Sequence, residues 1–390
     1  MKKETVMIPL EGRIDSVNAS ETEQRISALM QEHPDGIPVF DASGLTYIAS
    51  AGLRVLMKVR KAVGREMEIR DVSPAVYEIL ETTGFTELFR VKKRMREVSV
   101  EGCDVIGHGF YGTVYRLDPD TIVKVYSSPD CLPLIENERK MARMAFVHGI
   151  PTAISYDIVK VGDSYGSVFE LLKAQTMNDI LVSEPDRADE LVRTFTDVMK
   201  TVHAVELAPG TLPSAREIWL EHLETIFQWG SVTETQYTRI RQLLSDLPES
   251  CAVVHGDFHM KNVMVVDGEP LLIDMDTLTQ GSPIFDLQGV YVAYQAYEAD
   301  EPGNTMAFFG IDGDMGSFVW RRTIAYYFDQ KDAETLSRNE DRIRLAAAVR
   351  FLRLIGKTDL NTNELAAIRI RHTEAVIDDL LKRVDSLILE

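Results

Sequence analysis

The polar residues of one stretch, HGDFHMKN followed later by LLIDMD, have the types and the spacing that phosphoryl transfer needs. Asp257 precedes Asn262 by five positions, and Asp274 ends an apolar run. One carboxylate can orient and deprotonate an attacking hydroxyl group, while an amide and a second carboxylate can hold Mg2+ on the phosphates. An isolated Asp–Asn pair would indicate only a turn. The fuller set indicates catalysis, provided that an ATP-binding half lies upstream.

Short apolar runs must position these groups. The runs at 252–254, 263–266 and 270–273 predict three short buried strands. The first two runs flank the loop that carries His255, and a tight turn joins the last two. The third run is followed directly by Asp274 and, two positions later, by Asp276.

The length and composition bound the class of protein. A chain of 390 residues predicts two or three domains with proper cores. No apolar stretch approaches the length of a membrane span, so we expect no membrane association. Glu4 and Glu11 interrupt any signal-peptide core. The cysteines have no CxxC or metal spacing, which favours a reducing cytoplasm: Cys103, Cys131 and Cys251.

The net charge of −19 is unevenly distributed. Residues 1–100 hold 15 Lys and Arg against 15 Asp and Glu, so the whole excess lies in residues 101–390. Acidity on this scale argues against nucleic acid as a partner. It would suit a cationic substrate, although solubility alone also explains it.

The first hundred residues alternate between strand and helix patterns. We expect strands at 5–10, 37–40 and 66–71, and helices at 19–33, 51–63 and 74–82. Ser50 has the position of the N-cap of the second helix. This alternation predicts a small sheet covered by helices.

The segment DASGLTYIASAGL, residues 41–53, resembles the STAS domain of bacterial anti-sigma-factor antagonists, and the resemblance covers about 4–97. In that family the loop before the second helix carries a serine that a partner kinase phosphorylates to control docking. The usual Asp-Ser-Ser-Gly is replaced here by a segment in which Ala51 takes the phosphate-accepting place and Ser50 precedes it. Ser50 is therefore either a helix cap or a regulatory site, where the helix dipole would stabilise a phosphate.

A glycine-rich segment predicts the ATP-binding half. Gly107, Gly109 and Gly112 form a GxGxxG pattern, which is weak evidence alone. A dinucleotide site needs a helix directly after the glycines, whereas residues 113–117 are strand-like. A strand, a glycine turn and a second strand are how kinases cover nucleotide phosphates.

The next strand, 121–126, carries Lys124 among apolar residues, where a lysine is costly unless it is paired or bound to phosphate. In a kinase this lysine holds the α- and β-phosphates and a helix glutamate orients it. Glu136 and Glu138 are the candidates on the helix predicted at 134–148, and we prefer Glu138 because it shares an inward stripe with two alanines. The strand 165–172 then suits the connector near adenine, with Glu170 and Leu172 close to the base.

Residues 105–290 resemble the aminoglycoside phosphotransferase family of kinase-like enzymes, with HGDFHMKN as the catalytic loop and LLIDMD as the metal strand. The resemblance implies that Asp257 is the catalytic base and that Lys124 lies on the phosphates of ATP. It also implies that Asn262 and Asp274 are the Mg2+ ligands.

The same resemblance assigns supporting roles. His255 and Asp276 fall on positions that support the loop and the metal site, and Asp286 matches a structural aspartate after the metal strand. The match is specific to the fold and to ATP use, not to the substrate.

The remainder predicts a mostly helical substrate region. Amphipathic helices are expected at 186–206, 213–230, 233–246, 287–298, 318–330, 333–353 and 362–388. His203 on the first helix is expected to be packed or exposed, with a functional role the less favoured interpretation. Five acidic residues between the fourth and fifth helices could form an acidic lip for an amine substrate, or simply a solvated loop: Glu298, Asp300, Glu301, Asp312 and Asp314.

We therefore expect an α/β STAS-like domain over 1–97, joined to an α+β, two-lobed, protein-kinase-like domain with lobes at 101–172 and 173–390. The expected activity is transfer of phosphate from ATP, with Mg2+, to a hydroxyl of a small molecule that is aminoglycoside-, amino alcohol- or sugar-like. Gly256 stands where protein kinases carry an arginine, and only eleven residues separate Asp274 from Asp286, too few for a typical activation segment. The alternatives are a protein kinase in a partner-switching pathway, or a catalytically silent nucleotide sensor. The STAS-like domain suggests a protein partner.

Overall fold

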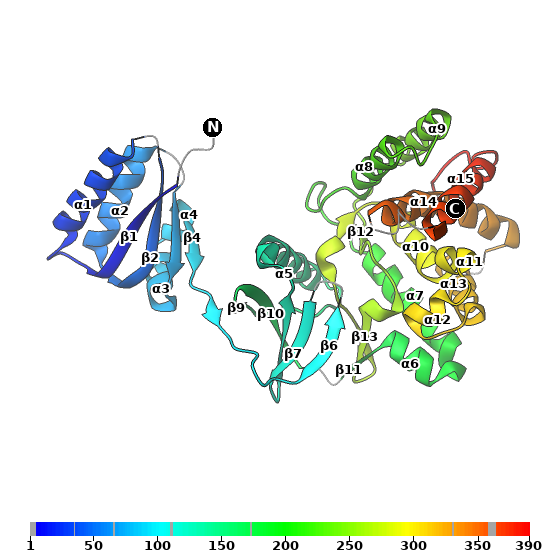
Figure 1. The fold of residues 1–390 in the computed structure, drawn as a ribbon, viewed down its shortest axis with the longest axis horizontal. Coiled ribbons are helices and arrows are strands. Elements are labelled where there is room, and N and C mark those ends of the chain that lie inside the picture. Colours follow the sequence, from blue (N-terminus) through cyan, green and yellow to red (C-terminus); the bar gives the residue numbers. More distant parts are fainter. Residues whose placement is uncertain are drawn as a thin grey trace. The chain divides into compact units, whose positions relative to one another are not determined.

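The computed structural model describes residues 5–34, 36–64, 67–109, 112–171, 174–329, 331–357 and 364–390. The chain divides into two compact units (Figure 1). The first comprises Met1–Glu101 with Ile158–Tyr165, and the second comprises Gly102–Asp157 with Gly166–Glu390. No helix among the described residues is long and apolar enough to cross a membrane.

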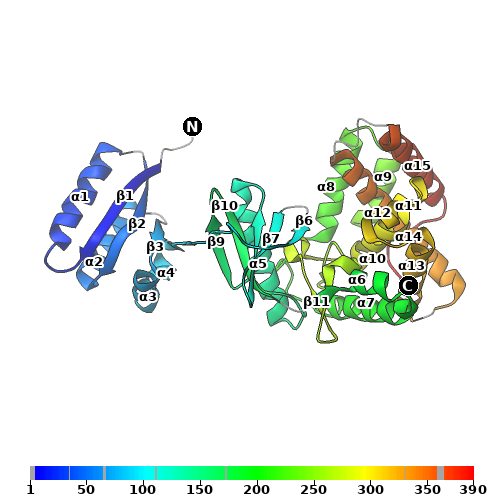
Figure 2. The same ribbon diagram turned by 60° about the horizontal axis from the view of Figure 1, so that its bottom comes forward.

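The first unit is built on a parallel sheet in the order β1-β2-β3-β4. Its strands are β1 (Thr5–Ile14), β2 (Ile37–Ile48), β3 (Glu68–Val72) and β4 (Arg90–Lys93). Parallel strands need crossover connections, and these contain α1 (Ala19–Glu32), α2 (Ser50–Val63), α3 (Pro74–Thr82) and α4 (Phe85–Leu88). Helices α1 and α2 lie side by side in both views (Figures 1 and 2). The predicted α/β class of this unit is confirmed.

Two local predictions for the first unit are wrong. The second strand does not end before Asp41 but continues to Ile48, because register irregularities in its pairing with β1 absorb the polar DASG segment. Helix α2 begins at Ser50, with Ala49 as its N-cap and no capping hydrogen bond from a side chain. Ser50 is exposed at the start of the helix.

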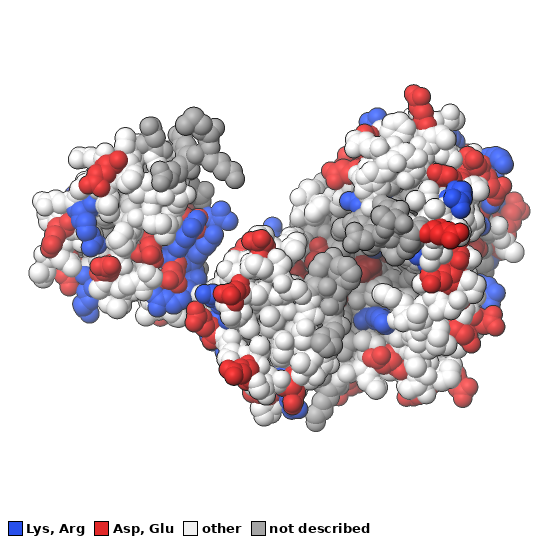
Figure 3. All heavy atoms as spheres, viewed as in Figure 1, with Lys and Arg blue, Asp and Glu red and all other residues white. Residues whose placement is uncertain are grey.

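The charged surface of the first unit is balanced by ion pairs. Figure 3 shows basic side chains gathered over β4 on the face drawn. Lys92 of β4 lies 3.0 Å from Glu68, and Arg94, just after the strand, lies 3.2 Å from Asp71. A short strand, β5 (Arg96–Glu97), follows and pairs in parallel with β9 (Asp157–Val161).

The second unit begins with strands that run antiparallel. In the order β10-β8-β7-β6 they are β10 (Ser164–Glu170), β8 (Thr121–Tyr126), β7 (Gly112–Asp118) and β6 (Val105–Gly109). Helix α5 (Leu132–Val147) follows β8. Strand β8 is apolar or aromatic except for Thr121 and Lys124, and Val123 is fully buried. The two strands that carry the glycines, β6 and β7, pair antiparallel, as expected for the predicted pair of strands.

The rest of the second unit is mainly helical, as predicted. Its helices are α6 (Met177–Ser183), α7 (Ala188–His203), α8 (Ala215–Gln228), α9 (Glu234–Ser245), α10 (Ile284–Tyr291), α11 (Tyr297–Asp300), α12 (Asn304–Phe309), α13 (Gly313–Tyr327), α14 (Ala333–Lys357) and α15 (Glu364–Leu380). A π-helical segment, Val292–Ala296, joins α10 to α11. The break predicted between 299 and 317 contains α12 and the start of α13.

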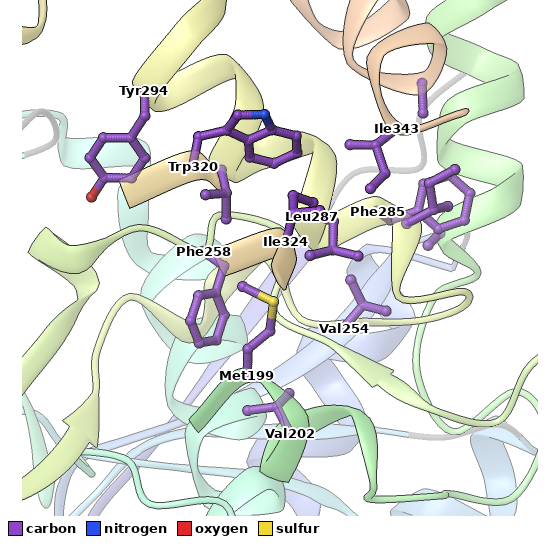
Figure 4. Close-up of a cluster of buried hydrophobic side chains, with 14 of the residues drawn as sticks. Met199, Val202, Val254, Phe258, Phe285, Leu287, Tyr294, Trp320, Ile324 and Ile343 are labelled. Carbon is purple, nitrogen blue, oxygen red and sulfur yellow. The ribbon is translucent and has the colours of Figure 1, made fainter. Parts of the chain in front are cut away.

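Short strands and a continuous core tie these helices together. The strands are β11 (Ala174–Thr176), β13 (Val263–Val266) and β14 (Glu269–Leu272) in one sheet, and β12 (Val253–Val254) with β15 (Thr279–Gln280) in another. Figure 4 shows three side chains within one buried cluster, namely Met199 from α7, Trp320 from α13, and Phe258. Because Phe258 belongs to the loop between β12 and β13, this core also anchors that loop.

Candidate active site

The segment 255–262, here called the HGD loop, connects β12 to β13 and ends in a single 3-10 turn, Met260–Asn262. Gly256 has φ +86°, and a Cβ there would lie 2.5 Å from the carbonyl oxygen of Thr277. Only glycine adopts this backbone without strain and without a clash. The site where protein kinases carry an arginine therefore has no room for a side chain.

Asp286 holds the start of the HGD loop. Its Oδ2 accepts the backbone N–H of His255 at 2.9 Å, and its Oδ1 accepts that of Gly256 at 2.6 Å. The side chain is completely buried, and burial alone would raise its pKa. Hydrogen bonding and charge interaction with His203, together with these donors, instead lower the pKa below its usual value. A carboxylate that is ionised at neutral pH thus fixes the loop.

His203 of α7 is the side-chain partner of Asp286. Its Nε2 lies 2.9 Å from Asp286 Oδ2, and its Nδ1 lies 2.8 Å from the hydroxyl of Tyr327. From the sequence we expect this histidine to be packed or exposed. In the structure it is buried and takes part in this chain of hydrogen bonds. Its role was missed because it depends on a contact 83 positions along the chain.

A buried tyrosine supports the middle of the loop. The hydroxyl of Tyr294 accepts the backbone N–H of Met260 at 3.1 Å. Tyr294 lies in the π-helical segment, and burial raises its pKa, so the phenol stays protonated. Irregular π-turns often occur at functional sites, but an apolar helical pattern in the sequence does not reveal one.

His255 makes hydrogen bonds through both ring nitrogens. Its Nδ1 accepts the N–H of Asp257 at 3.3 Å, and its Nε2 lies 3.1 Å from the carbonyl oxygen of Ile273. A carbonyl only accepts, so Nε2 carries the proton. The ring therefore ties the HGD loop to the end of β14.

Asp257 lies at the tip of the loop with three donors around its carboxylate. Arg350 of α14 donates from Nη2 to Oδ1 at 2.9 Å. Asn262 Nδ2 lies 3.4 Å from Oδ2 and His259 Nε2 lies 3.6 Å from it. Partial burial alone would raise the pKa of Asp257, but His259 and Arg350 lower it well below the usual value.

The β13–β14 pairing brings Asn262 next to Asp274. The backbone N–H of Ile273 donates to the carbonyl of Asn262 at 3.0 Å, one residue before Asp274. Asp274 has φ +56°, a left-handed conformation that is uncommon outside glycine. An amide and a carboxylate are oxygen donors of the kind that Mg2+ prefers. Among the described residues, no group of three His, Cys, Asp or Glu side chains is arranged to hold a metal ion.

Asp276 lies beside this pair and has an unusual acidity. Desolvation by the surrounding protein raises the pKa of Asp276 to about 6, and repulsion from the nearby carboxylates of Glu138 and Asp274 adds to the shift. Lys124 opposes it. Its side chain is nevertheless accessible to solvent, and the crowding of negative charge suits a site that receives a cation.

Lys124 of β8 reaches across to the metal strand. Its Nζ lies 2.8 Å from Asp274 Oδ1 and 3.5 Å from Glu138 Oε1. Burial would lower the pKa of Lys124, but the two carboxylates raise it above the usual value, so the amine stays charged. The structure thus brings Glu138 of α5 to the lysine, whereas Glu136 is exposed on the same helix.

A tyrosine that sequence reasoning missed orients Glu138. The hydroxyl of Tyr126 donates to Oε2 of Glu138, while Oε1 faces Lys124. Tyr126 is two positions after the lysine on the same strand, so both side chains point to the same face. That spacing was a usable signal in the sequence.

The glycines lie in the β6–β7 hairpin. At Gly112 a Cβ would come 2.1 Å from the carbonyl oxygen of Val125, so this position requires glycine. Gly107 lies in β6, where an added Cβ would make an ordinary 3.9 Å contact with the side chain of Val114, and Gly109 ends the strand. Glu170 is exposed at the end of β10, and Leu172 lies outside the described residues.

Four of the five acidic residues of the expected lip have hydrogen-bond or ion-pair partners within the chain. Glu298 accepts the N–H of Gly303 at 2.7 Å and both the N–H and hydroxyl of Thr305. Three others have partners of their own: Asp300 with His372, Glu301 with Arg369, and Asp312 with the N–H of Met315. These four carboxylates stabilise local structure, while Glu301, Asp312 and the fifth residue, Asp314, remain exposed.

The site therefore has the parts of a kinase-like phosphotransferase, namely a lysine–glutamate pair on a glycine-containing sheet and an HGD loop beside an aspartate that ends a strand. Residues 103–325, more than half of the chain, match the model of the phosphotransferase enzyme family, APH, and the chain belongs to this family. It is an ATP-dependent phosphotransferase. Residues 2–98 match the STAS domain, which the chain carries at its N-terminal end.

Relatives of each part are known. The BtrV protein of Bordetella bronchiseptica, named as an anti-sigma factor antagonist, is 34% identical over 85 residues, which are 21% of this chain and 72% of that protein. The ADP-bound aminoglycoside phosphotransferase APH(2'')-Ib is 13% identical, with 72% of this chain and 93% of that chain covered and a TM-score of 0.45. A choline/ethanolamine kinase family protein from Mesorhizobium loti is 14% identical, with 72% and 92% covered and a TM-score of 0.45.

Proposed function

We propose that this protein transfers the γ-phosphoryl group of ATP to a hydroxyl group of a small molecule, with Mg2+ as the cofactor. The observation that supports this proposal most strongly is the convergence of Lys124, Asp274 and the HGD loop. Lys124 and Asp274 form a 2.8 Å ion pair, and Asn262, next to Asp274 on the paired strand, contacts Asp257. Such a set is costly to assemble unless it is used, because its charges repel or must be desolvated.

The proposed roles follow from chemistry and position. Lys124 binds phosphate oxygens of ATP, and Glu138 orients it. Asn262 and Asp274 would hold Mg2+, which neutralises charge on the phosphates when it is bound. Asp257 accepts the proton of the acceptor hydroxyl as the oxygen bonds to the γ-phosphorus, and the bond from that phosphorus to ADP breaks.

The low pKa of Asp257 makes it a weak base. This is compatible with phosphoryl transfer, because a loose transition state leaves the proton on the hydroxyl until late and catalysis depends mainly on positioning. Orientation of the hydroxyl is thus the larger part of the role that we propose for Asp257.

The segment after Asp274 favours a small acceptor over a protein. A single 3-10 turn, Met275–Thr277, and the two-residue strand β15 occupy it before α10 begins at Ile284. No part of this described segment forms the long loop on which protein kinases bind a peptide. We infer that the STAS domain regulates or docks the enzyme.

The proposed acceptor is aminoglycoside-, amino alcohol- or sugar-like. The expected acidic lip does not select between a neutral and a cationic member of this set, because four of its carboxylates have partners in the fold while Glu301 and Asp312 also remain exposed. Arg369 offsets the charge of Glu301, but Glu298 and Asp312 accept from uncharged N–H and hydroxyl groups and keep theirs.

The test is a screen of ATP consumption with Mg2+ against neutral sugars, amino alcohols, aminoglycosides and the isolated N-terminal domain. We expect turnover with a small-molecule acceptor that Asp257→Asn reduces to a small residual rate while ATP binding is retained. Asp267→Asn is the matched control, because it removes a nearby carboxylate in a turn where asparagine also adopts the positive φ of 50°. Phosphate on the N-terminal domain would favour a protein kinase, and ATP binding without any turnover would contradict the proposal.

A further inference from the structure

Helix α14 reaches the HGD loop through one side chain. Arg350 donates from Nη2 to Oδ1 of Asp257 at 2.9 Å and from Nη1 to the carbonyl oxygen of Gly256. Because Gly256 and Asp257 are adjacent, the planar guanidinium group can bind the backbone of the first and the side chain of the second at the same time. The arginine is 93 positions away from Asp257 in the sequence.

The body of α14 is fixed, so the position of Arg350 is fixed too. Its neighbours Val349, Phe351 and Leu352 are 0%, 3% and 1% exposed. Helix α14 also packs against α8, α10 and α15. The side chain of Arg350 is only 17% exposed. A guanidinium so far removed from water needs hydrogen-bonding partners, and the HGD loop supplies them.

Arg350 provides the shortest side-chain contact to the Asp257 carboxylate. The other two donors, Asn262 and His259, stand at 3.4 and 3.6 Å and belong to the loop itself. They move with the loop and cannot set its position relative to the rest of the lobe. Arg350 comes from a separate, rigid helix, and its contact selects one orientation of the carboxylate.

We propose that Arg350 is a positioning residue, which holds the Asp257 carboxylate in the orientation that receives the acceptor hydroxyl. This inference rests on the proposed function, since it assigns a role in the same transfer step. Arg350 does not contact ATP or the acceptor in this role and acts through Asp257. Helix α14 lies beyond residues 103–325, which match the phosphotransferase family. In this proposal it contributes to the active site through Arg350.

Three variants of α14 separate positioning from folding. Arg350→Met keeps the apolar stem and removes both hydrogen bonds, and Arg350→Lys keeps the charge but cannot form the paired contact. Arg353→Met is the matched control, one turn along on the same helix, where the guanidinium lies 5.1 Å from the ring of Trp229 and away from the loop contacts described here.

We expect Arg350→Met to lower kcat about 100-fold with an unchanged KM for ATP, because misplacement of a reacting group by about 1 Å has an effect of this size. Arg350→Lys should recover part of the loss, and Arg353→Met should leave kcat within twofold. The double variant Asp257→Asn/Arg350→Met should be no slower than Asp257→Asn alone, since groups that act as a unit are not additive. A normal kcat in Arg350→Met, or losses that multiply in the double variant, would overturn the proposal.

A second measurement does not depend on turnover. Amide hydrogen exchange across residues 255–262 should be faster in full-length Arg350→Met than in the wild type, while Arg353→Met leaves it unchanged. If the wild-type enzyme transfers no phosphate to any acceptor, the proposed function fails, and the exchange result alone decides whether Arg350 holds the loop. Equal exchange in all three proteins would show that it does not.

Discussion

The Nε2 atom of His203 lies 2.9 Å from Oδ2 of Asp286, and both side chains are shielded from water. This contact joins α7 to the start of α10, and the same carboxylate accepts the backbone N–H groups of His255 and Gly256. One buried charge therefore links two helices to the HGD loop. Its removal would leave several buried donors without acceptors.

We expect Asp286→Ala to destabilise the protein by about 3–5 kcal/mol, the usual cost of removing one partner from a buried charged pair. Asp286→Asn should cost less, because the amide oxygen still accepts one of the backbone donors. Urea unfolding monitored by circular dichroism measures both. Asp186→Asn, at an exposed position, is the control and should lie close to the wild type.

The lowered pKa of Asp286 also predicts how stability depends on pH. A carboxylate whose pKa is lowered in the folded state stabilises it fully above the ordinary value near 3.8 and loses this contribution as the pH falls below that value. The stability difference between the wild type and Asp286→Asn should thus be constant from pH 7 to 5 and shrink below about pH 4. Urea midpoints between pH 3 and 7 test this, and a difference that stays constant down to pH 3 would contradict it.

Two glycines with nearly equal backbone angles allow the clash at Gly256 to be measured. Gly256 has φ +86° and Gly268 has φ +87°, but only at the first would an added Cβ meet another atom, the carbonyl oxygen of Thr277 at 2.5 Å. Gly268→Ala should cost about 1–2 kcal/mol for the left-handed backbone alone. Gly256→Ala should cost a further 1–3 kcal/mol or so for overpacking.

The variant at Gly256 should also affect activity, because any relief of the clash moves the residue before Asp257. We expect kcat to fall at least about tenfold in Gly256→Ala and to stay near the wild-type value in Gly268→Ala. Equal stability and equal kcat in the two variants would show that the loop accommodates a side chain after all.

Much of the site in the second unit could be predicted from the sequence, because its residues lie in short local motifs. HGDFHMKN and LLIDMD are short, so the spacing of Asp257, Asn262 and Asp274 can be read directly, and the β13–β14 hairpin brings the last two together. The preference for Glu138 over Glu136 follows from helix phase, since an inward stripe is a 3.6-residue pattern. The structure places Glu138 beside Lys124.

Contacts between residues that are far apart in the chain could not be predicted from the sequence. Arg350 lies in a helix whose amphipathic pattern predicts its burial side but not its partner, and the partner is set by how α14 packs in three dimensions. The engagement of Glu298 and Asp312 in turns is likewise invisible in composition, which shows only that they are acidic. The extension of β2 through a polar segment depends on pairing with β1, which local propensity does not encode.

The STAS domain offers a test of tight packing at a motif glycine. A Cβ at Gly52 would lie 2.6 Å from Cγ2 of Ile14 and 2.7 Å from Cγ1 of Ile48, both buried. Gly52→Ala should destabilise this domain by about 1–3 kcal/mol through overpacking, although alanine is the better helix former. Ser50→Ala should change stability by less than about 0.5 kcal/mol, because this exposed side chain caps no helix end. Thermal unfolding distinguishes the two, and a large loss in Ser50→Ala would show that Ser50 has a structural role.

Lys124 provides the most direct test of nucleotide binding. Its charge is balanced by Asp274 and Glu138, and we expect it to turn to phosphate when ATP binds. Lys124→Met should lower kcat/KM for ATP about 10²- to 10³-fold, the usual effect of removing one group that stabilises developing charge. Tyr126→Phe removes the hydrogen bond that orients Glu138 and the contact of the same hydroxyl with Ser167, and its loss should not exceed about tenfold. Lys140→Met, at an exposed position on α5, is the control. If Lys124→Met and Lys140→Met bind ATP equally well and turn over equally fast, Lys124 has no role on the phosphates, and the lysine–glutamate pair is only a structural ion pair.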